Sequence, residues 1–487
     1  MMKQKVLLVG DSRLCPQVAY VMDWQDYATV ECLTDATQYR DHRIVVCALR
    51  NKSKSLIKVK DKDLKITYLD DICRELDQQY AACNYATETA TSLLKRLLLK
   101  ILRLWGRQGI ICGQYWLRKI PARYLRPSEL LLRVLYSPAT DIVCDRPGRV
   151  CRVNPDGSMT GCITGVLLPF GNIKTQNPAV IYNDARARII KLSSINRSYC
   201  LCNVRKCEFA NRNIAPHFKD LPPQDHPVVI ELALDEACNL NCPSCRRELN
   251  TGNAAAQEGI ERMVTQLLDA GWLDKAGSIT LASMGEVFYS PNYRRLITTD
   301  FKRKQIFILS NGTLFNQANW DLLKDKYEQI DVSISVDAAT PTTYQKVRGG
   351  DFKQLQQNLA MLSELRQAGK INFLEINFVV QQDNYRDMPA FVKWGKELRV
   401  DHIWFKQLED WGTFDGKDYA ERRMVIKNRY LAPELYAVLQ DPIFKDPIVD
   451  ITSFQPYLAS SAKRYGEWNE TSGREQQMTK SGSKVIL

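Results

Sequence analysis

Three cysteines stand close together in the middle of the chain, in the run Cys238-Asn-Leu-Asn-Cys242-Pro-Ser-Cys245. Their C-x3-C-x2-C spacing puts three thiolates on one tight loop, and three thiolates can hold three irons of a [4Fe-4S] cube. Such a cube normally takes four thiolates. One iron is then open to another ligand, so the spacing predicts a cluster that binds a small molecule directly.

Two other interpretations of these cysteines stay open. A structural zinc ion also takes thiolates but needs a fourth ligand, and the nearest histidine, His226, lies before the preceding apolar run rather than beside the loop. The three cysteines can also be unrelated buried residues. The open-iron cluster is favoured, because the loop directly follows an expected buried strand at 228–234 and further polar motifs follow the later strands.

Strand and helix patterns alternate from residue 228 to about 410, and this repeated βα pattern predicts a partial parallel barrel of six units. In such a barrel the carboxyl ends of the strands build the site. The expected strands are 228–234, 278–282, 305–309, 330–336, 373–380 and 402–406, and the expected helices are 255–270, 291–300, 316–326, 352–368 and 385–399.

Over about 228–410 the chain resembles the radical SAM superfamily. Ser283-Met284-Gly285-Glu286 stands where that family carries a G-G-E-P-type motif, and Ser310-Asn311-Gly312-Thr313 resembles its T-N-G-T turn. Ser335-Val336-Asp337 resembles its S-x-D motif, and Arg348 fits an arginine often found near the cofactor carboxylate. Ser244 stands where many members place an aromatic residue. The resemblance implies S-adenosylmethionine contacts from Gly285, Glu286, Ser310, Asn311, Ser335, Asp337 and Arg348.

The same resemblance implies an activity. The open iron of the cluster chelates S-adenosylmethionine, one electron cleaves the cofactor, and the resulting 5′-deoxyadenosyl radical abstracts hydrogen from a peptide, protein or sugar-containing (glycan-type) substrate. A flavodoxin or ferredoxin is the expected electron donor. The residues that complete the reaction cannot be identified from the sequence, although Lys406, Glu409 and Asp410 follow the sixth expected strand.

A second set of cysteines precedes the expected barrel. Cys144 and Cys162 flank Gly157, and Cys202 and Cys207 follow as C-x4-C; four thiolates are enough to close another cluster. The arrangement resembles the SPASM or twitch type of auxiliary-cluster module, although that module more often follows the barrel. A structural zinc on the same thiolates is the alternative. Two further cysteines, Cys151 and Cys200, are candidates for a substitute ligand or a hydrogen-atom donor.

The remaining segments suggest how the chain is divided. Residues 1–88 read as a small Rossmann-like parallel α/β domain, with strands near 5–9, 28–33, 43–48 and 65–69 but no G-x-G-x-x-G turn. Residues 92–107 form a basic amphipathic pattern, which predicts either a connecting helix or contact with a membrane surface. The expected divisions are 1–88, a connector at 89–140, the cysteine-rich module at 141–220, the barrel at 226–440, and an extension and tail at 441–487.

Composition limits the class of protein. The chain has 487 residues with 45% hydrophobic and 25% charged residues, an ordinary globular balance, and a net charge of +12. No apolar run is long enough to cross a membrane, and the first residues do not read as a signal peptide, so a cytoplasmic protein is expected. A non-catalytic zinc-binding or nucleic-acid-binding protein is the rival interpretation. No nucleic-acid partner is expected, because the aromatic residues do not interleave with one basic groove.

Overall fold

The computed structural model describes most of the chain in two compact units, Met1–Pro227 and Val228–Leu487. The basic segment 92–107, most of the expected connector and the last residues of the chain lie outside the described residues, as do Ser283 and Met284. The described residues are 6–10, 14–22, 27–30, 43–47, 66–82, 127–162 without 143 and 145, 168–204, 207, 226–281 without 253, and 285–466 without 411, 412 and 428.

The first unit begins with a small parallel sheet in the strand order β2-β1-β3-β4. Its central strand β1 has the sequence VLLV and is buried at all four positions, as a strand covered on both faces must be. The predicted parallel α/β arrangement is therefore confirmed for the described residues. The elements are β1 (Val6–Val9), α1 (Leu14–Met22), β2 (Tyr27–Val30), β3 (Arg43–Val46), β4 (Ile66–Tyr68) and α2 (Leu69–Ala82).

The cysteine-rich part of the first unit is built on a short antiparallel meander, β5-β6-β7. A tight turn joins β5 to β6, in which Gly157 has φ +85° and Asp156 Oδ1 accepts the backbone N–H of Ser158 at 2.9 Å. Helix α8 packs against α1 and α5. The elements are α5 (Pro127–Leu135), α6 (Arg146–Arg149), β5 (Val150–Val153), β6 (Ser158–Thr160), β7 (Gly171–Asn172), α7 (Pro178–Asn183) and α8 (Ala185–Ile195).

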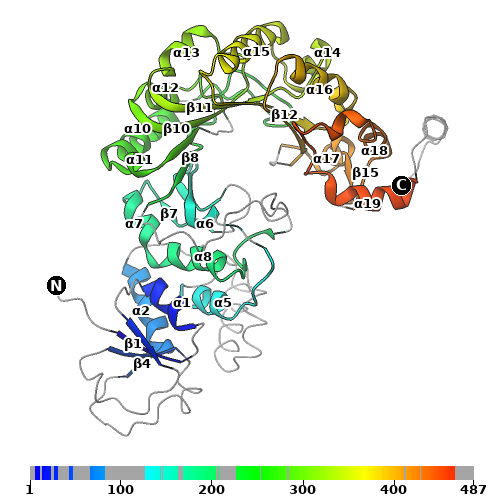
Figure 1. Ribbon diagram of the computed structural model, residues 1–487. Helices are drawn as coiled ribbons and strands as arrows, with labels where there is room; N and C mark the ends of the chain where they lie inside the picture. The colour runs from blue at the N-terminus through cyan, green and yellow to red at the C-terminus, as the bar shows by residue number, and fades with distance from the viewer. Residues whose placement is uncertain are drawn as a thin grey trace. The chain divides into compact units, whose positions relative to one another are not determined.

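The second unit contains a curved parallel sheet whose strands follow one another in chain order. Figure 1 shows the sheet as an arch with its helices along the outer side. The six predicted strands are all present, and a two-residue strand that sequence reasoning missed, β16, pairs with β13. The strands are β8 (Val229–Leu232), β9 (Ser278–Leu281), β10 (Phe301–Ser310), β11 (Tyr327–Ser335), β12 (Phe373–Val380), β13 (His402–Gln407) and β16 (Val449–Asp450).

Side chains alternate across this sheet. Ile308, Ile334 and Ile376 are fully buried, on the face that the helices cover. Their neighbours on the opposite face include Ser333 and Asn377, which are polar. Because successive residues of a strand point to opposite faces, the sequence produces an apolar outer face and a polar inner face. The predicted partial parallel barrel is confirmed as a fold class.

The helices of the second unit begin at well-formed caps. Thr340 Oγ1 accepts the backbone N–H of Thr343, and Pro341 follows at the first helical position. The helices are α10 (Ala254–Asp269), α11 (Trp272–Lys275), α12 (Pro291–Thr298), α13 (Gln317–Leu323), α14 (Pro341–Val347), α15 (Phe352–Gln367), η6 (Tyr385–Asp387) and α16 (Met388–Glu397).

A C-terminal extension follows the sixth barrel strand. It contains a small antiparallel hairpin, β14-β15, against which α19 packs. Helix α19 lies in the segment that the sequence predicted only as an extension and tail. The elements are α17 (Gly416–Arg422), β14 (Val425–Ile426), β15 (Tyr430–Leu431), α18 (Pro433–Val438), η7 (Pro442–Lys445) and α19 (Gln455–Tyr465).

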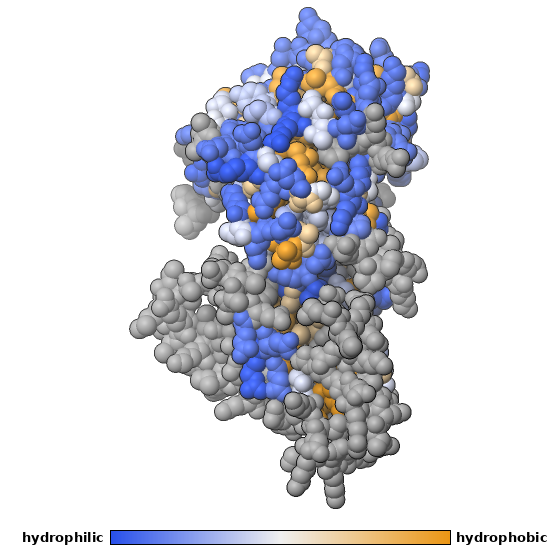
Figure 2. Space-filling model, turned by 90° about the vertical axis from the view of Figure 1, so that its left-hand side faces the viewer, coloured by the Kyte–Doolittle hydropathy of each residue, from blue (hydrophilic) through white to orange (hydrophobic). Residues whose placement is uncertain are grey.

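The described surface offers little apolar area. In the described part of the chain, no helix is both long and apolar enough to span a bilayer. On the face shown in Figure 2, the residues not drawn in grey are mostly hydrophilic, with small separate apolar patches. The exposed large hydrophobic side chains among the described residues are scattered: Tyr27, Val180, Leu249 and Tyr289.

Candidate metal and cofactor site

The loop after β8 brings its three cysteines together. Cys238 and Cys242 are each 6% exposed and pack with Leu240 and the partly buried Cys245. Backbone bonds hold the loop in shape, from Cys238 N to Asn250 O at 2.8 Å and from Cys245 N to Cys242 O at 2.9 Å. Three thiols on one short, internally bonded loop are the donor set that the sequence predicted.

Each of these three sulfurs has one side-chain N–H donor. Asn311 Nδ2 lies 3.7 Å from Cys238 Sγ, and Arg348 Nη1 lies 3.8 Å from Cys242 Sγ. The third donor is Arg246, whose Nη2 lies 3.5 Å from Cys245 Sγ. Donors of this kind stabilise thiolate charge and tune the potential of iron–sulfur centres. The surroundings of the three sulfurs therefore fit metal-bound thiolates.

When no metal is bound, burial disfavours the negative charge of the thiolates at Cys238 and Cys242. Burial raises the pKa of Cys238, partly offset by a backbone hydrogen bond from Leu240 and the charge of Arg246. The pKa of Cys242 is raised in the same way, with Arg348 opposing the shift. A positive metal centre would supply the missing charge, because thiol ligands bind as thiolates.

Gly285 lies directly against the cysteine loop. A Cβ at this position would stand 2.6 Å from Asp235 O and closer still to Ala237 O, both backbone atoms. The next residue, Glu286, donates its backbone N–H to Ala237 O at 2.8 Å. The loop after β9 can pass this close to the cysteine loop only because residue 285 has no side chain.

Glu286 is completely buried and organises the turn after β10. Its Oε1 accepts from Ser310 Oγ at 2.7 Å and from Phe288 N at 3.2 Å, and its Oε2 accepts from Asn311 N at 2.7 Å. Burial raises the pKa of Glu286, and these hydrogen bonds oppose the shift. A carboxylate accepts about four hydrogen bonds, so three protein donors leave room for about one more.

Asn311 connects that turn to the cysteine loop. Its Nδ2 donates to Asn239 Oδ1 at 2.9 Å as well as facing Cys238, while its Oδ1 accepts from Thr313 N at 2.9 Å. Asn358 on α15 donates to the backbone carbonyls of Gly312 and Thr313. The turn is thus fixed from both sides, and Asn311 holds one orientation.

Asp337 and Arg348 form a buried ion pair at the carboxyl end of β11. Arg348 Nη2 lies 2.7 Å from Asp337 Oδ2, and Asp337 Oδ1 accepts from Val379 N at 2.6 Å. Asp337 has φ +63°, and Asn384 Nδ2 donates to its carbonyl. Burial lowers the pKa of Arg348, but the charge of Asp337 outweighs it and raises that pKa overall. The guanidinium is therefore a fixed cation beside the cysteine loop.

Most predicted site residues of the second unit lie at this edge of the sheet. The structure joins Gly285, Glu286, Ser310, Asn311, Asp337 and Arg348 to the three cysteines through the contacts above, and the half-buried Ser335 ends β11 nearby. Sequence reasoning missed Arg246, Asn239 and Asn384. Arg246 directly follows Cys245 and Asn239 directly follows Cys238, so both carried a local signal; Asn384 reaches the site from a distant segment.

The inner face of the sheet carries a polar network nearer the start of its strands. Glu375 Oε1 accepts from Ser333 Oγ at 2.5 Å, and Glu375 Oε2 lies 2.7 Å from His402 Nδ1. His402 Nε2 lies 3.6 Å from Asp450 on β16. Burial lowers the pKa of His402, but hydrogen bonds to Asp450 and Glu375 raise it to about 9. The imidazolium joins three neighbouring strands.

The three candidates named by position after the sixth strand differ in their surroundings. Lys406 is half-buried, with Nζ 3.5 Å from the centroid of the Trp404 ring. Its positive charge partly offsets the rise that burial causes in the pKa of Asp337. Glu409 and Asp410 are exposed. Lys406 is thus the one of the three that faces the cofactor edge.

In the first unit, the four predicted auxiliary cysteines lie near one another, and two of them, Cys144 and Cys202, contact Tyr199. The Tyr199 hydroxyl accepts from Cys144 N at 2.6 Å, and Cys202 N donates to Tyr199 O at 2.9 Å. Burial raises the pKa of Cys144 to about 11, with smaller contributions from Cys162 and Cys207. The pKa of Cys202 is raised by burial and by the same neighbours. The thiols are close enough to act electrostatically on one another.

Within the ranges that the structure describes, no three histidine, cysteine, aspartate or glutamate side chains converge closely enough to hold one metal ion.

Comparisons with known proteins address the second unit. The model of the radical SAM superfamily matches residues 235–394. The antilisterial bacteriocin subtilosin biosynthesis protein AlbA of Bacillus subtilis is 29% identical over 197 residues, which cover 39% of this chain and 41% of AlbA. A probable GTP 3′,8-cyclase of Methanococcus vannielii is 23% identical over 172 residues, which cover 34% of this chain and 54% of the cyclase.

The chain thus spans about half or less of the length of these curated relatives. Among solved structures, SuiB of Streptococcus suis aligns over 51% of this chain and 53% of SuiB, with 17% identity and a TM-score of 0.34. The family match begins just before Cys238 and includes Glu286, Asn311, Asp337 and Arg348. Residues 235–394 of this chain are therefore a radical SAM superfamily domain.

Proposed function

We propose that this protein is an enzyme that reductively cleaves S-adenosylmethionine at a [4Fe-4S] cluster on Cys238, Cys242 and Cys245, and uses the radical so formed to modify a peptide. The observation that carries the proposal is the set of three thiols, two buried and one partly buried, each with its own N–H donor, in a unit whose sequence contains no fourth cysteine. A cube bound there keeps one iron for the cofactor.

When bound, the cluster and S-adenosylmethionine together supply a 5′-deoxyadenosyl radical through one-electron cleavage of a sulfur–carbon bond. The residues of the chain orient and enclose these groups. Glu286 has about one acceptor position left, which suits an amino group. Arg348 presents a fixed positive charge for a carboxylate, although Asp337 already shares it. We assign further cofactor contacts to Gly285, Ser310, Asn311, Ser335 and Asp337.

A peptide is the proposed substrate because of one relative. AlbA is named as a bacteriocin biosynthesis protein, and bacteriocins are peptides or proteins. The half-buried Trp404 on the inner face of the sheet offers a ring surface to such a chain. A glycan-type substrate is the alternative, and product mass spectrometry distinguishes the two. A flavodoxin or ferredoxin is the proposed electron donor.

We further propose a second [4Fe-4S] cluster on Cys144, Cys162, Cys202 and Cys207. The support is their mutual electrostatic contact, together with the contacts of Cys144 and Cys202 with Tyr199. The two remaining cysteines of this region differ from them. Cys151 is fully buried, and its charge partly offsets the lowering of the Lys191 pKa. Cys200 Sγ lies 3.5 Å from Ser198 Oγ. We therefore leave both outside the ligand set.

Anaerobic purification tests the function. The full chain, reconstituted with iron and sulfide, should be brown and should release 5′-deoxyadenosine from S-adenosylmethionine when dithionite is added. A colourless zinc protein that leaves the cofactor intact would support the rival interpretation of a non-catalytic zinc-binding or nucleic-acid-binding protein. Replacing Arg366, which pairs with Asp401 away from the cysteines, gives a matched control that should keep the activity.

Iron and sulfide counting tests the division of the cysteines. The Cys238→Ala/Cys242→Ala/Cys245→Ala variant should lose 5′-deoxyadenosine formation and keep roughly one cluster's iron, about four atoms. The quadruple alanine variant at Cys144, Cys162, Cys202 and Cys207 should keep the same amount of iron on the other three thiols. If the first variant binds no iron, the proposed second cluster is wrong.

A further inference from the structure

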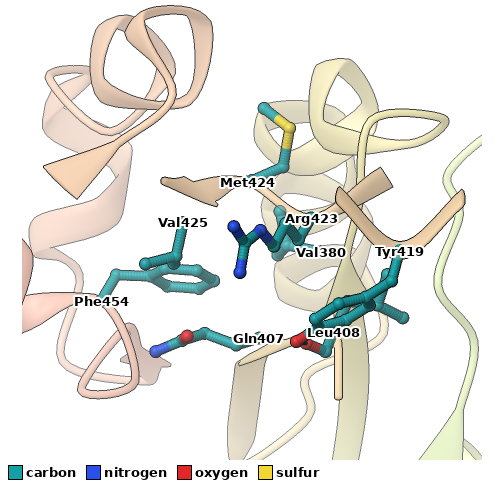
Figure 3. Close-up of a pocket in the computed structure, with 8 residues that line it drawn as sticks. All are labelled: Val380, Gln407, Leu408, Tyr419, Arg423, Met424, Val425 and Phe454. Atoms are coloured by element: carbon teal, nitrogen blue, oxygen red, sulfur yellow. Dashed lines mark hydrogen bonds between the residues drawn. The ribbon is translucent and has the colours of Figure 1, made fainter. Parts of the chain in front are cut away.

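A small pocket opens at the carboxyl edge of the sheet, beside β12 and β13. It is small and partly open: its cavity volume is about 20 Å³. Val380 ends β12, Gln407 ends β13, and the C-terminal extension supplies the opposite wall (Figure 3). The lining residues are Val380, Gln407, Leu408, Tyr419, Arg423, Met424, Val425 and Phe454. None of them belongs to the cysteine site described above.

The guanidinium of Arg423 points into the middle of this pocket (Figure 3). The backbone fixes its starting point, because Arg423 N donates to Tyr419 O at 3.0 Å and Arg423 forms a β-bridge with Gln381. The guanidinium carbon lies 5.6 Å from the centroid of the Tyr419 ring. In the described residues, no carboxylate lies within ion-pairing distance of this guanidinium.

The neighbouring arginine, Arg422, differs from Arg423 because it has a carboxylate partner. Arg422 Nη1 lies 2.6 Å from Asp383 Oδ2, and Lys346 Nζ lies 2.6 Å from Asp383 Oδ1. Asp383, two residues after Gln381, is thus already shared by two cations. Arg423, the C-cap of α17, instead points into the pocket, among apolar groups, the Gln407 amide and Tyr419, on which the charges of Glu409 and Asp410 also act. A cation in such a place gains most from an anion supplied by a ligand.

Resting on the proposed function, we propose that this pocket binds one carboxylate of the substrate peptide through Arg423. Gln407 donates to Ser453 O, and the Tyr419 hydroxyl donates to Leu408 O, so both side chains hold the pocket in shape. Val380, Val425 and Phe454 are among the apolar residues of the lining. One guanidinium balances a single negative charge, whereas a phosphate dianion would remain half uncompensated.

The position of the pocket relates the carboxylate to the site of chemistry. Gln407 ends β13, which lies two strands from β11, where Asp337 follows the last residue. At about 4.8 Å per strand, this separation is roughly 10 Å.

Binding of blocked amino acids to the full chain tests the proposal without turnover. The probes are acetyl-glutamate N-methylamide, its neutral glutamine counterpart, and acetyl-glutamine with a free α-carboxylate, measured by ligand-observed NMR. The wild type should bind a charged probe roughly tenfold or more tightly than the neutral one. Preference between the two charged probes tells whether a side chain or a C-terminus occupies the pocket.

Variants locate the binding. Arg423→Gln should abolish the preference for charged probes, and Arg423→Lys should keep part of it. Arg429→Gln, an exposed arginine stacked on Tyr430, is the matched control and should behave as the wild type. Equal binding of charged and neutral probes, an equal loss in Arg429→Gln, or stronger competition by inorganic phosphate than by acetate would overturn the proposal.

The two proposals fail separately. Carboxylate binding without 5′-deoxyadenosine formation would leave the pocket standing and remove the proposed activity. Formation of 5′-deoxyadenosine by the wild type without carboxylate binding would support the proposed activity and remove the proposed carboxylate site.

Discussion

Arg348 Nη2 lies 2.7 Å from Asp337 Oδ2, and both side chains are almost completely buried. The pair ties the end of β11 to the residue that caps α14, and the same guanidinium faces Cys242 Sγ. One buried ion pair therefore joins the sheet edge to the cysteine loop. A change at Arg348 affects both the stability of this edge and the electrostatics of the thiols.

Arg348→Gln should destabilise the second unit by about 3–5 kcal/mol, because it leaves the Asp337 carboxylate buried without a cation. Urea unfolding measures the loss. Adding Asp337→Asn should recover part of the stability but none of the S-adenosylmethionine cleavage. Arg366→Gln breaks a half-exposed pair with Asp401 and should cost about 1 kcal/mol or less. Equal costs for Arg348→Gln and Arg366→Gln would contradict the role given to burial.

Gly285→Ala should disrupt the packing of the loop after β9 on the cysteine loop. The new Cβ would meet the backbone carbonyls of Asp235 and Ala237, which cannot rotate away. We expect a loss of about 2–4 kcal/mol in stability together with reduced iron retention after desalting. Gly416→Ala is the matched control, since nothing lies within 4 Å of its Cβ and it begins helix α17. Normal iron content in Gly285→Ala would show that the close approach is not required.

His402 should make the second unit less stable as pH rises. Its pKa is about 9 in the folded protein and about 6.5 when unfolded, so its contribution is complete below pH 6.5 and is lost as pH rises through 9. The expected loss is about 2 kcal/mol, a reduced figure because a quarter of the side chain is exposed. His402→Gln should remove this slope, and His226→Gln should not. Calorimetric unfolding at pH 6 and pH 9.5 measures it.

Lys191 should have the opposite effect in the first unit. Its Nζ is buried, donates to Tyr182 O at 2.8 Å, and lies 3.1 Å from the centroid of the Tyr182 ring. Burial lowers its pKa to about 7, so the unfolded chain holds the proton more tightly up to pH 10.5 and stability rises with pH between 7 and 10.5. Lys191→Met should stabilise α8 near pH 7 by about 2 kcal/mol.

The advantage of Lys191→Met should shrink toward pH 10. Hydrogen exchange of α8 peptides, corrected for the intrinsic effect of pH, measures this local stability. A variant that is less stable than the wild type at both pH values would mean that the ring contact and the hydrogen bond outweigh the cost of burying the amine.

The sequence by itself was enough for the six main barrel strands, for most of the helices between them and for the superfamily of the domain at 235–394, but not for short elements such as α14. Apolar runs such as Phe373–Val380 and capped helices such as Phe352–Gln367 are local patterns, so their positions could be predicted within a few residues. The cysteine spacing from 238 to 245 is also local, and it led to the radical SAM domain that the comparison at 235–394 confirms. Strand β16 has only two residues and no such pattern, and it was missed.

Only the tertiary structure decided which polar groups meet. The N–H donors to Cys238 and Cys242 come from residues 73 and 106 positions later in the chain, and no periodicity encodes such a pairing. The same holds for the His402 network across β11, β12, β13 and β16, and for Arg423 in its pocket. These contacts depend on how parallel strands align at one edge, a consequence of packing the apolar outer face under the helices rather than of any local sequence.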